Sequence, residues 1–502
     1  MIFPWGKLNI SILLRPAKLL SMYIALLLPL LVVDVQRLFA QCQGQVISLA
    51  SAAACTASAA PLAVDLKVDP THPYRLDELI DLAERNNPKT RMAWESATQA
   101  ADRLGIARSA YYPRLAALAI FGDQRLINPW PKALLPRGYS MVEIPIAQGG
   151  LGLEYDVFDF GRRGAQLESS KAQRLAAVAA FQRTSQDVAF HVVTAYYDLL
   201  TAKERLEAGH QIVKTATTTQ QAAEAQLANG RATLPDVLNA RAATAQAAYD
   251  LEAAVGAEAE ARVALRESIG AEPSDGIAIE APKTAPLPAE ISSMAAKLVE
   301  LATQNRPDLK DLSERLRAAN AQLKAAHAEN RPSIQLKASG AQSAVWPTAD
   351  SGKLGTANMP IWNVGVNLQW SLFDGGRRRN EVRQAESRGR EAQEALRDKQ
   401  NQVAREVWTS YLQFRTAVRQ QEASEMLLTS ATTSYDASLD AYRYGVKNLV
   451  DLVAAETQLA QARLAHVQSH SNLLVSAVNL DYKTGNLLRQ AAPLVESSPA
   501  RP

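Results

Sequence analysis

The feature that most constrains this chain is a long pattern that occurs twice. Each copy has a strand-like segment, the motif Phe-Asp-x-Gly-Arg-Arg (158–163 and 373–378), a long stretch without proline and a glycine near its end. The copies align at a constant offset of 215 residues, which pairs Phe158 with Phe373, Asp159 with Asp374, Gly161 with Gly376, Gly230 with Gly445 and Asp236 with Asp451. Such an internal repeat predicts one structural unit built twice.

The segments before the motif alternate between apolar and polar residues. Apolar residues occupy every second position: Leu151, Leu153, Tyr155 and Val157, then Val364, Val366, Leu368, Trp370 and Leu372. Alternation predicts strands with one apolar face, either in a soluble sheet or in a membrane β-barrel. We expect a second strand in each copy, at 115–121 and 334–340, and loops at 123–148 and 342–360.

The stretch after each motif predicts a very long helix. In the first copy a heptad-like seam runs from Val188 through Leu199 to Ala216, and in the second from Val403 through Phe414 to Ala431. Such seams are typical of side-by-side helix packing, and a helix of this length would reach ~100 Å. Shorter helices, interrupted near prolines, are expected at 76–110 and 298–330.

Each long helix ends in a tight turn. Gly230 and Gly445 occupy the position of a helix-terminating glycine, and Asp236 and Asp451 lie where a capping box would start a returning helix. Pro235 is compatible with the first helical turn. Each copy is therefore predicted to form an antiparallel helical hairpin, with returning helices at 238–270 and 451–485.

The expected organisation follows from these elements. Residues 1–60 are expected to form an export region and 61–75 a linker. Residues 76–270 form the first repeat, 271–290 a linker, 291–488 the second repeat and 489–502 a disordered tail. The run 19–33, preceded by Lys18 and broken by Pro29, suits a secretory signal, with a retained anchor as the alternative. Cleavage could follow Ala40 or fall within 52–60. The two cysteines, Cys42 and Cys55, lie in this region, and lipidation of Cys55 is a further possibility.

Composition and motifs exclude several classes of function. The chain has 54 basic and 51 acidic residues, which gives no charge argument for a nucleic-acid partner. His466 and His470 lack the glutamate of a metalloprotease helix, so we interpret them as solvated rather than metal-binding. The arginines of each motif are interpreted as parts of a structural junction or lipid-headgroup contacts, and Asp159 and Asp374 as helix caps. We expect no enzyme, no cofactor and no metal.

Two strands per copy predict an oligomeric barrel. Four strands are too few to close a barrel, and an unpaired edge is forbidden in hydrocarbon, so several chains would have to share one. The predicted fold is mixed α and β but mostly α. It has four transmembrane strands and long coiled-coil hairpins, which together form a β-barrel and a helical tunnel.

Residues 76–488 resemble the TolC family of outer-membrane efflux proteins. The resemblance rests on Asn-Pro at 87–88, the approach Ala-Arg-Ser-Ala-Tyr-Tyr-Pro at 107–113, the doubled Phe-Asp-x-Gly-Arg-Arg motif and, above all, the tip from Tyr442 to Asp451. It implies a homotrimer in the outer membrane of a Gram-negative bacterium, lipid around the barrel and a periplasmic tunnel. It also implies an adaptor and an inner-membrane pump of RND or ABC type as partners.

The resemblance also implies roles for single residues. Tyr442, Lys447, Asp451 and Asp236 match positions that hold the aperture shut. The tips Gly230, Leu234, Gly445 and Leu449 would dock the adaptor, and Phe158, Asp159, Gly161, Phe373, Asp374 and Gly376 would form the junction between barrel and helices. The chain departs from the family at Ala454, where a second acidic residue is expected, and at Pro235. These departures put in doubt whether cations block the aperture of this protein.

Two other classes were weighed against the channel. A periplasmic coiled-coil adaptor of the membrane-fusion type is the main alternative, but such a protein normally has one hairpin flanked by β-domains. A cytosolic coiled-coil scaffold fits neither the signal-like segment nor the strands. The sequence leaves the exported substrate open.

Overall fold

The structure is a computed structural model that describes residues 68–280, 295–350 and 352–487. The expected signal at 1–60, both cysteines, and the tail at 489–502 lie outside the described residues. Within the described part, no helix is long and apolar enough to cross a membrane.

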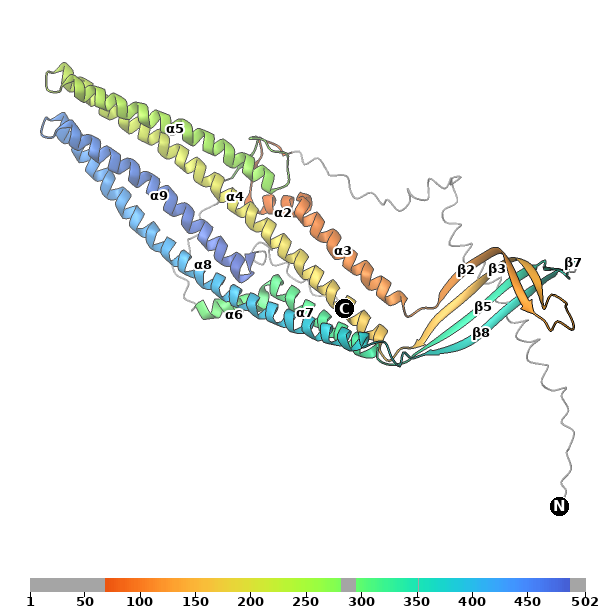
Figure 1. The fold of residues 1–502 in the computed structure, drawn as a ribbon. Coiled ribbons are helices and arrows are strands. Elements are labelled where there is room, and N and C mark those ends of the chain that lie inside the picture. Colours follow the sequence, from red (N-terminus) through yellow and green to blue (C-terminus); the bar gives the residue numbers. More distant parts are fainter. Residues whose placement is uncertain (1–67, 281–294, 351, 488–502) are drawn as a thin grey trace, which may run out of the picture. The chain divides into compact units, whose positions relative to one another are not determined.

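The two halves of the described chain have the same order of main elements (Figure 1). The first half comprises β1 (Pro73–Tyr74), α2 (Leu76–Asn86), α3 (Pro88–Ser109), β2 (Arg114–Pro129), β3 (Tyr139–Phe158), α4 (Arg162–Ala228) and α5 (Leu234–Ser268). The second comprises β4 (Ala278–Ile279), α6 (Ala295–Asn305), α7 (Pro307–Ala328), β5 (Ser333–Val345), β6 (Thr348–Ala349), β7 (Gly352–Lys353), β8 (Ala357–Gln369), α8 (Arg377–Arg443) and α9 (Leu449–Thr484).

The four long strands form an antiparallel sheet in the order β2-β3-β5-β8, in which the short β6 pairs with β3 and β7 pairs with β6. The strands are longer than the sequence predicted. Most of the expected loop at 123–148 belongs to β2 and β3, and about half of the expected loop at 342–360 belongs to β5 and β8. Proline misled the prediction, because Pro129 lies at the end of β2 and Pro145 lies within β3.

One face of this sheet is apolar and exposed. Cross-strand partners share a face, and one such row joins Leu115, Leu153, Ala338 and Val364. Exposed members of this face include Leu115 (68%), Val364 (63%) and Val366 (70%). The predicted alternation is thus present, with two corrections. A β-bulge between Asp156 and Phe158 displaces Val157 from the pattern, and β8 ends before Trp370 and Leu372.

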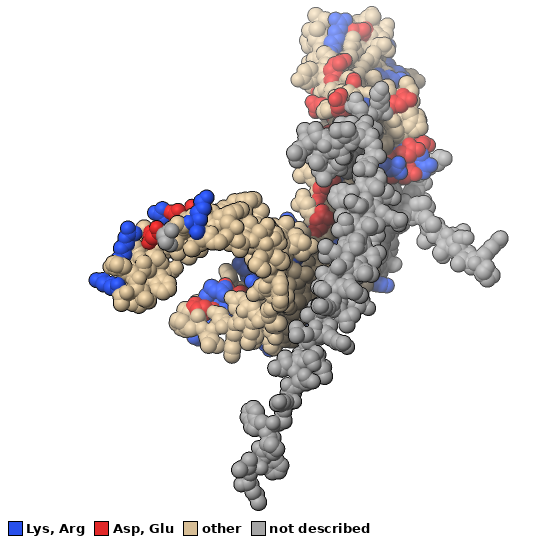
Figure 2. Space-filling view, turned by 90° about the vertical axis from the view of Figure 1, so that its right-hand side faces the viewer, with Lys and Arg blue, Asp and Glu red and all other residues tan. Residues whose placement is uncertain are grey.

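The opposite face of the sheet borders a cavity of about 500 Å³. The lining of this cavity combines polar residues such as Arg114 with apolar ones such as Leu118 and Ile361. A Cβ at Gly150 would lie 2.4 Å from the Cβ of Ala341, a distance that no side chain tolerates. Glycine at this position therefore allows neighbouring strands to approach and the sheet to curl, as Figures 1 and 2 show.

Both long helices, each 67 residues, form antiparallel hairpins with their returning helices. α4 packs against α5, α8 packs against α9, α3 lies on α4, and α7 packs against both α4 and α8 (Figure 1). The predicted seams are buried at Val188, Leu199, Ala216, Val403 and Phe414. The returning helices begin earlier than predicted, at Leu234 and Leu449, because the cap residues precede them directly.

Parts of the expected linkers are structured. Pro73–Tyr74 pairs in parallel with Ala278–Ile279. Ile277 and Ile279 belong to a core cluster that also contains Leu79, Tyr196 and Leu265. Residues 271–280 therefore return to the body of the first hairpin rather than spanning away from it.

Candidate functional site at the helix tips

The candidate site is the pair of turns at the free ends of the two hairpins. Each turn closes with a left-handed glycine, Gly230 (φ 67°) and Gly445 (φ 76°). The amide of Arg231 donates to the carbonyl of Gln226 (2.8 Å), and that of Val446 donates to the carbonyl of Ala441 (2.8 Å). These bonds satisfy carbonyls that a helix end would leave free, and a side chain at either glycine would oppose the positive φ. Both glycines thus have the predicted terminating role.

The returning helices start with different caps. In the first tip the Asp236 carboxylate accepts from the backbone amide (2.8 Å) and hydroxyl (2.7 Å) of Thr233. These bonds hold the pKa of Asp236 below its ordinary value. In the second tip the Asn448 side chain accepts from the amide of Asp451 (2.9 Å). The capping-box prediction is therefore confirmed at Asp236, whereas at Asp451 the cap uses the backbone and leaves the carboxylate out.

All four predicted aperture residues line one cavity of about 860 Å³: Asp236, Tyr442, Lys447 and Asp451. Within the described chain, however, their hydrogen bonds run to other partners. Asp236 is bound to Thr233, and Lys447 donates to the Ser438 hydroxyl (3.2 Å). Lys447 and Asp451 are exposed. The structure therefore brings the four residues to one place without joining them into a latch inside a single chain.

Two residues of the cavity hold the hairpins together at this level. The Gln226 side chain donates to the carbonyls of Tyr442 (3.2 Å) and Arg443 (2.8 Å) at the end of α8. Tyr442 is 6% exposed, and its hydroxyl has no hydrogen-bond partner among the described residues. Burial, and then the charge of Asp236, raise the pKa of Tyr442. Sequence reasoning missed Gln226, because its partners are more than two hundred residues away.

The predicted docking leucines differ in accessibility. Leu234 is 60% exposed, whereas Leu449 is 5% exposed and belongs to a core cluster with Tyr442 and Leu452. Leu449 is therefore covered in this conformation, and its part in docking an adaptor stays a prediction. The exposed apolar side chains of the second tip are Tyr444 (82%), Val446 (79%) and Val450 (72%).

The junction between sheet and helices is built alike in both halves. Gly161 (φ 90°) and Gly376 (φ 88°) precede α4 and α8. The Asp159 carboxylate accepts from the Gly161 amide (3.2 Å) and from the amide (2.8 Å) and Nε (3.0 Å) of Arg163. Asp374 does the same toward Gly376 (3.1 Å) and Arg378 (3.2 and 2.6 Å). Both aspartates are helix-start caps, as predicted.

The aromatic residues of this junction are partly or largely exposed. Phe158 is 48% exposed and packs edge-to-face on Phe160, with ring centres 4.6 Å apart, while Phe373 is 88% exposed. Among the described residues no cluster of three histidine, cysteine or carboxylate side chains could hold a metal. His470 is not simply solvated, because its Nδ1 lies 3.3 Å from the carboxylate of Glu204 on α4.

A curled sheet with an exposed apolar face, continued by two long helical hairpins, is the architecture expected of an outer-membrane efflux protein. The family model described as outer membrane efflux protein matches residues 79–271 and 298–486, so this chain belongs to that family. Protein CyaE of Bordetella pertussis is 29% identical over 426 residues, covering 83% of this chain and 86% of CyaE. Outer membrane protein TolC of Escherichia coli is 25% identical over 444 residues, covering 85% of each chain.

Solved structures agree with this assignment. A membrane protein from Pseudomonas aeruginosa superposes with a TM-score of 0.72 at 25% identity and covers 85% of this chain and 98% of its own. The protein is therefore a TolC-family member of the outer membrane of a Gram-negative bacterium, and its relatives include efflux and secretion proteins.

Proposed function

We propose that the protein is a homotrimeric channel-tunnel that serves as the exit duct of a tripartite efflux or type I secretion system. Conduction through it is passive, and the periplasmic helix tips control access. The observation that carries the proposal is the sheet, which combines an exposed apolar face with unpaired outer strands.

The edges of the sheet require partners. In the described chain, β2 pairs only with β3 and β8 pairs only with β5, so the outer sides of a 16-residue strand and a 13-residue strand are free. The apolar face suits hydrocarbon, where an unpaired backbone amide or carbonyl costs several kcal/mol. Edge pairing between β2 of one copy and β8 of the next removes both edges. Three copies, each with four long strands, then close a barrel of twelve strands.

We place the gate at the tips. Lys447 and Asp451 are exposed and carry opposite charges, so they are free to pair across protomer boundaries in the trimer. Tyr442 is buried beside them, with a hydroxyl that no described residue bonds, and Asp236 lies across the same cavity. Single exposed ion pairs contribute ~0.2–1 kcal/mol, so threefold repetition would make the latch firm and still reversible.

The tip surface indicates the partners. Leu234, Tyr444, Val446 and Val450 expose apolar side chains at the ends of both hairpins, where a monomeric protein gains nothing from them. A periplasmic adaptor of the membrane-fusion type would cover this surface and connect the duct to an RND or ABC pump. The adaptor function itself is not favoured for this chain, because an adaptor would need neither the apolar sheet face nor its open edges.

Planar-bilayer recording tests the proposal. Wild-type protein, purified from membranes in mild detergent, is expected to give discrete conductance that rises in Asp451→Ala. Asp440→Ala is a matched control, because Asp440 is an exposed aspartate paired with Arg443 on the same tip. Conductance that is equal in all three proteins would refute the latch and keep the channel. Absence of conductance from an assembled membrane protein would refute the duct.

A further inference from the structure

The contact between the two hairpins differs in chemistry from the contacts within them. One row of α9, spaced seven residues apart, reads Leu449, Glu456, Arg463 and His470. Heptad spacing keeps such residues on one side of a helix, and here that side contacts α4. Three successive positions of this seam are therefore ionisable, where a permanent helix–helix seam would be apolar.

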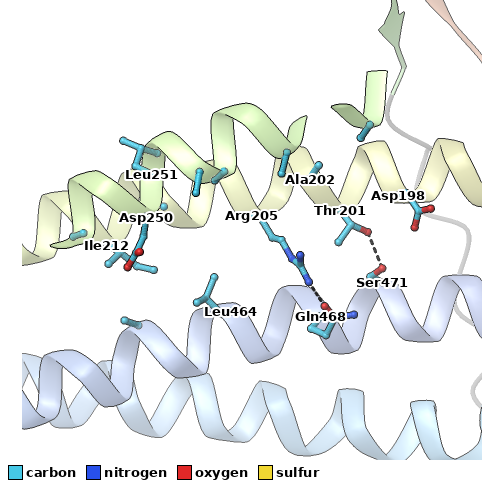
Figure 3. A pocket seen from close by; sticks show the side chains of 17 residues that line it. Asp198, Thr201, Ala202, Arg205, Ile212, Asp250, Leu251, Leu464, Gln468 and Ser471 are labelled. Carbon is cyan, nitrogen blue, oxygen red and sulfur yellow. Dashed lines mark hydrogen bonds between the residues drawn. The ribbon is translucent and has the colours of Figure 1, made fainter. Parts of the chain in front are cut away.

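The His470 end of the seam is an inter-hairpin bridge. His470 faces Glu204 of α4 at 3.3 Å, and both side chains are about one-third exposed (32% and 33%). Flanking contacts join the same helices: the hydroxyls of Thr201 and Ser471 lie 2.7 Å apart, and Arg205 donates to Gln468. Figure 3 shows both contacts beside a cavity that separates the hairpins. From α8, the charge of Glu425 also acts on His470.

The middle of the seam is held by neutral acceptors. Arg463 donates to the Gln211 carbonyl (3.1 Å) and the Thr215 hydroxyl (2.9 Å) of α4. Neither partner changes its charge near neutral pH, so this contact stays the same when the two ends of the seam titrate.

The Glu456 end has a buried carboxylate without a counter-ion. Glu456 is 8% exposed, and its Oε2 has no partner among the described residues. Thr219 of α4 bonds to the carboxylate, and Tyr435 of α8 is the titratable group that faces it. An ionised carboxylate in such a place opposes packing, while a protonated one does not.

We infer that the α4–α9 seam is a proton-sensitive clasp that holds the two hairpins together more firmly at mildly acidic pH than at neutral pH. Protonation of His470 creates an ion pair with Glu204, and protonation of Glu456 removes an unpartnered buried charge. Both changes stabilise the packed seam. Firmer packing of the hairpins would keep the end of the tunnel shut, and this consequence for transport rests on the proposed function. The clasp itself does not depend on conduction.

The directions of the pKa values agree with this sign. The hydrogen bond with Glu204 raises the pKa of His470, so its contribution is complete below the unperturbed value and is lost as pH rises through the raised one. Burial raises the pKa of Glu456, so its penalty at neutral pH disappears as pH falls through that value.

Tip separation measured between two spin labels tests the clasp. Labels are attached at Leu238→Cys and Val450→Cys, both exposed positions on the two hairpins, in the full chain with Cys42 and Cys55 replaced by serine. When the pH is lowered from about 8 to about 4.5, through the ordinary pKa ranges of histidine and glutamate, we expect the fraction of molecules with a long label-to-label distance to fall about threefold, the size of effect of a partly exposed ion pair.

Substitutions of the ionisable residues of the seam show which side chains cause the pH response. His470→Gln should reduce the pH response, His470→Gln with Glu456→Gln should abolish it, and His466→Gln on the same helix should keep it. A response that survives the double variant, has the opposite sign or is absent from the unmodified seam would overturn the clasp. A normal response in a protein that does not conduct in bilayers would support the clasp and refute the duct instead.

Discussion

Replacement of Arg306 should destabilise the protein far more than replacement of its counterpart in the first half. Arg306 is 1% exposed and binds Asp308 through two bonds, Nε to Oδ1 (3.0 Å) and Nη2 to Oδ2 (2.6 Å), and Glu406 through Nη1 (2.8 Å). Arg306→Ala removes these bonds, together with the one that Nη1 donates to the Lys483 carbonyl (3.3 Å), and leaves two carboxylates in a poorly solvated place. We expect a loss of about 3–5 kcal/mol of unfolding free energy.

The first half provides the matched control. Asn87 precedes Pro88 as Arg306 precedes Pro307, and Gly270 and Gly485 lie against Asn87 and Arg306 respectively. The Asn87 side chain is a neutral cap that accepts from the Lys89 amide (2.9 Å) and donates to the Ser268 carbonyl (2.9 Å). Asn87→Ala should therefore cost only ~1–2 kcal/mol.

Denaturant unfolding followed by circular dichroism at matched detergent concentration measures both losses. Lys399 and Lys483 lie 3.3 Å from Asp308 and 3.4 Å from Glu406, and their compensation sets the lower end of the range for Arg306→Ala. An Arg306→Ala loss no larger than that of Asn87→Ala would refute the argument that the buried charges depend on Arg306.

The same network predicts the response to acid. Burial raises the pKa of Asp308, but the hydrogen bonds and charge of Arg306 outweigh it and hold the pKa at about 2 against an ordinary 3.8. The folded-state pKa is depressed, so the contribution is complete above 3.8 and is lost as pH falls toward about 2. The unfolding free energy of the wild type should therefore fall more steeply across this window than that of Arg306→Ala. Equal slopes would contradict the assignment.

Two further substitutions test the sheet and the tip. Gly150→Ala should reduce the yield of folded, membrane-inserted protein because its Cβ would meet Ala341, whereas Gly149→Ala, with nothing within 4 Å, should not. Heat-modifiable migration in electrophoresis compares the two, and equal behaviour would refute the account of the curl. Asp236→Asn should weaken the bonds from Thr233, because a neutral amide accepts less strongly than a carboxylate, and should speed hydrogen exchange in the first turn of α5; unchanged exchange would show that the carboxylate is dispensable.

Sequence patterns predicted the elements whose signals are local. Heptad seams, terminating glycines and capping aspartates act within a few residues, so both hairpins and their tips followed from the sequence. The ends of the strands could not be predicted in this way. Pro145, Gly149 and Gly150 indicate a loop when they are considered alone, yet they lie inside β3, whose backbone is paired with that of its neighbours. The registers of β3 with β5 join residues far apart in sequence and have no local signature.

The helix tips illustrate the same limit of prediction from local sequence. Leu234 and Leu449 occupy equivalent positions of the two copies, yet one is exposed and the other buried, because Leu449 lies in the core shared by both hairpins and Leu234 does not. Gln226, Glu456 and His470 matter through contacts with the other hairpin. A repeat predicts two similar hairpins, but the asymmetric contact between them arises only in three dimensions.

Cross-linking of the free sheet edges tests the central claim most directly. Leu118 on β2 and Ile361 on β8 lie in one cross-strand row and on one face, so cysteines there, in a chain with Cys42 and Cys55 replaced, can be joined by a flexible bismaleimide in intact cells. The account predicts a covalent product that ends at the trimer. Monomers alone, or a ladder that continues beyond three, would contradict a closed barrel shared by three chains.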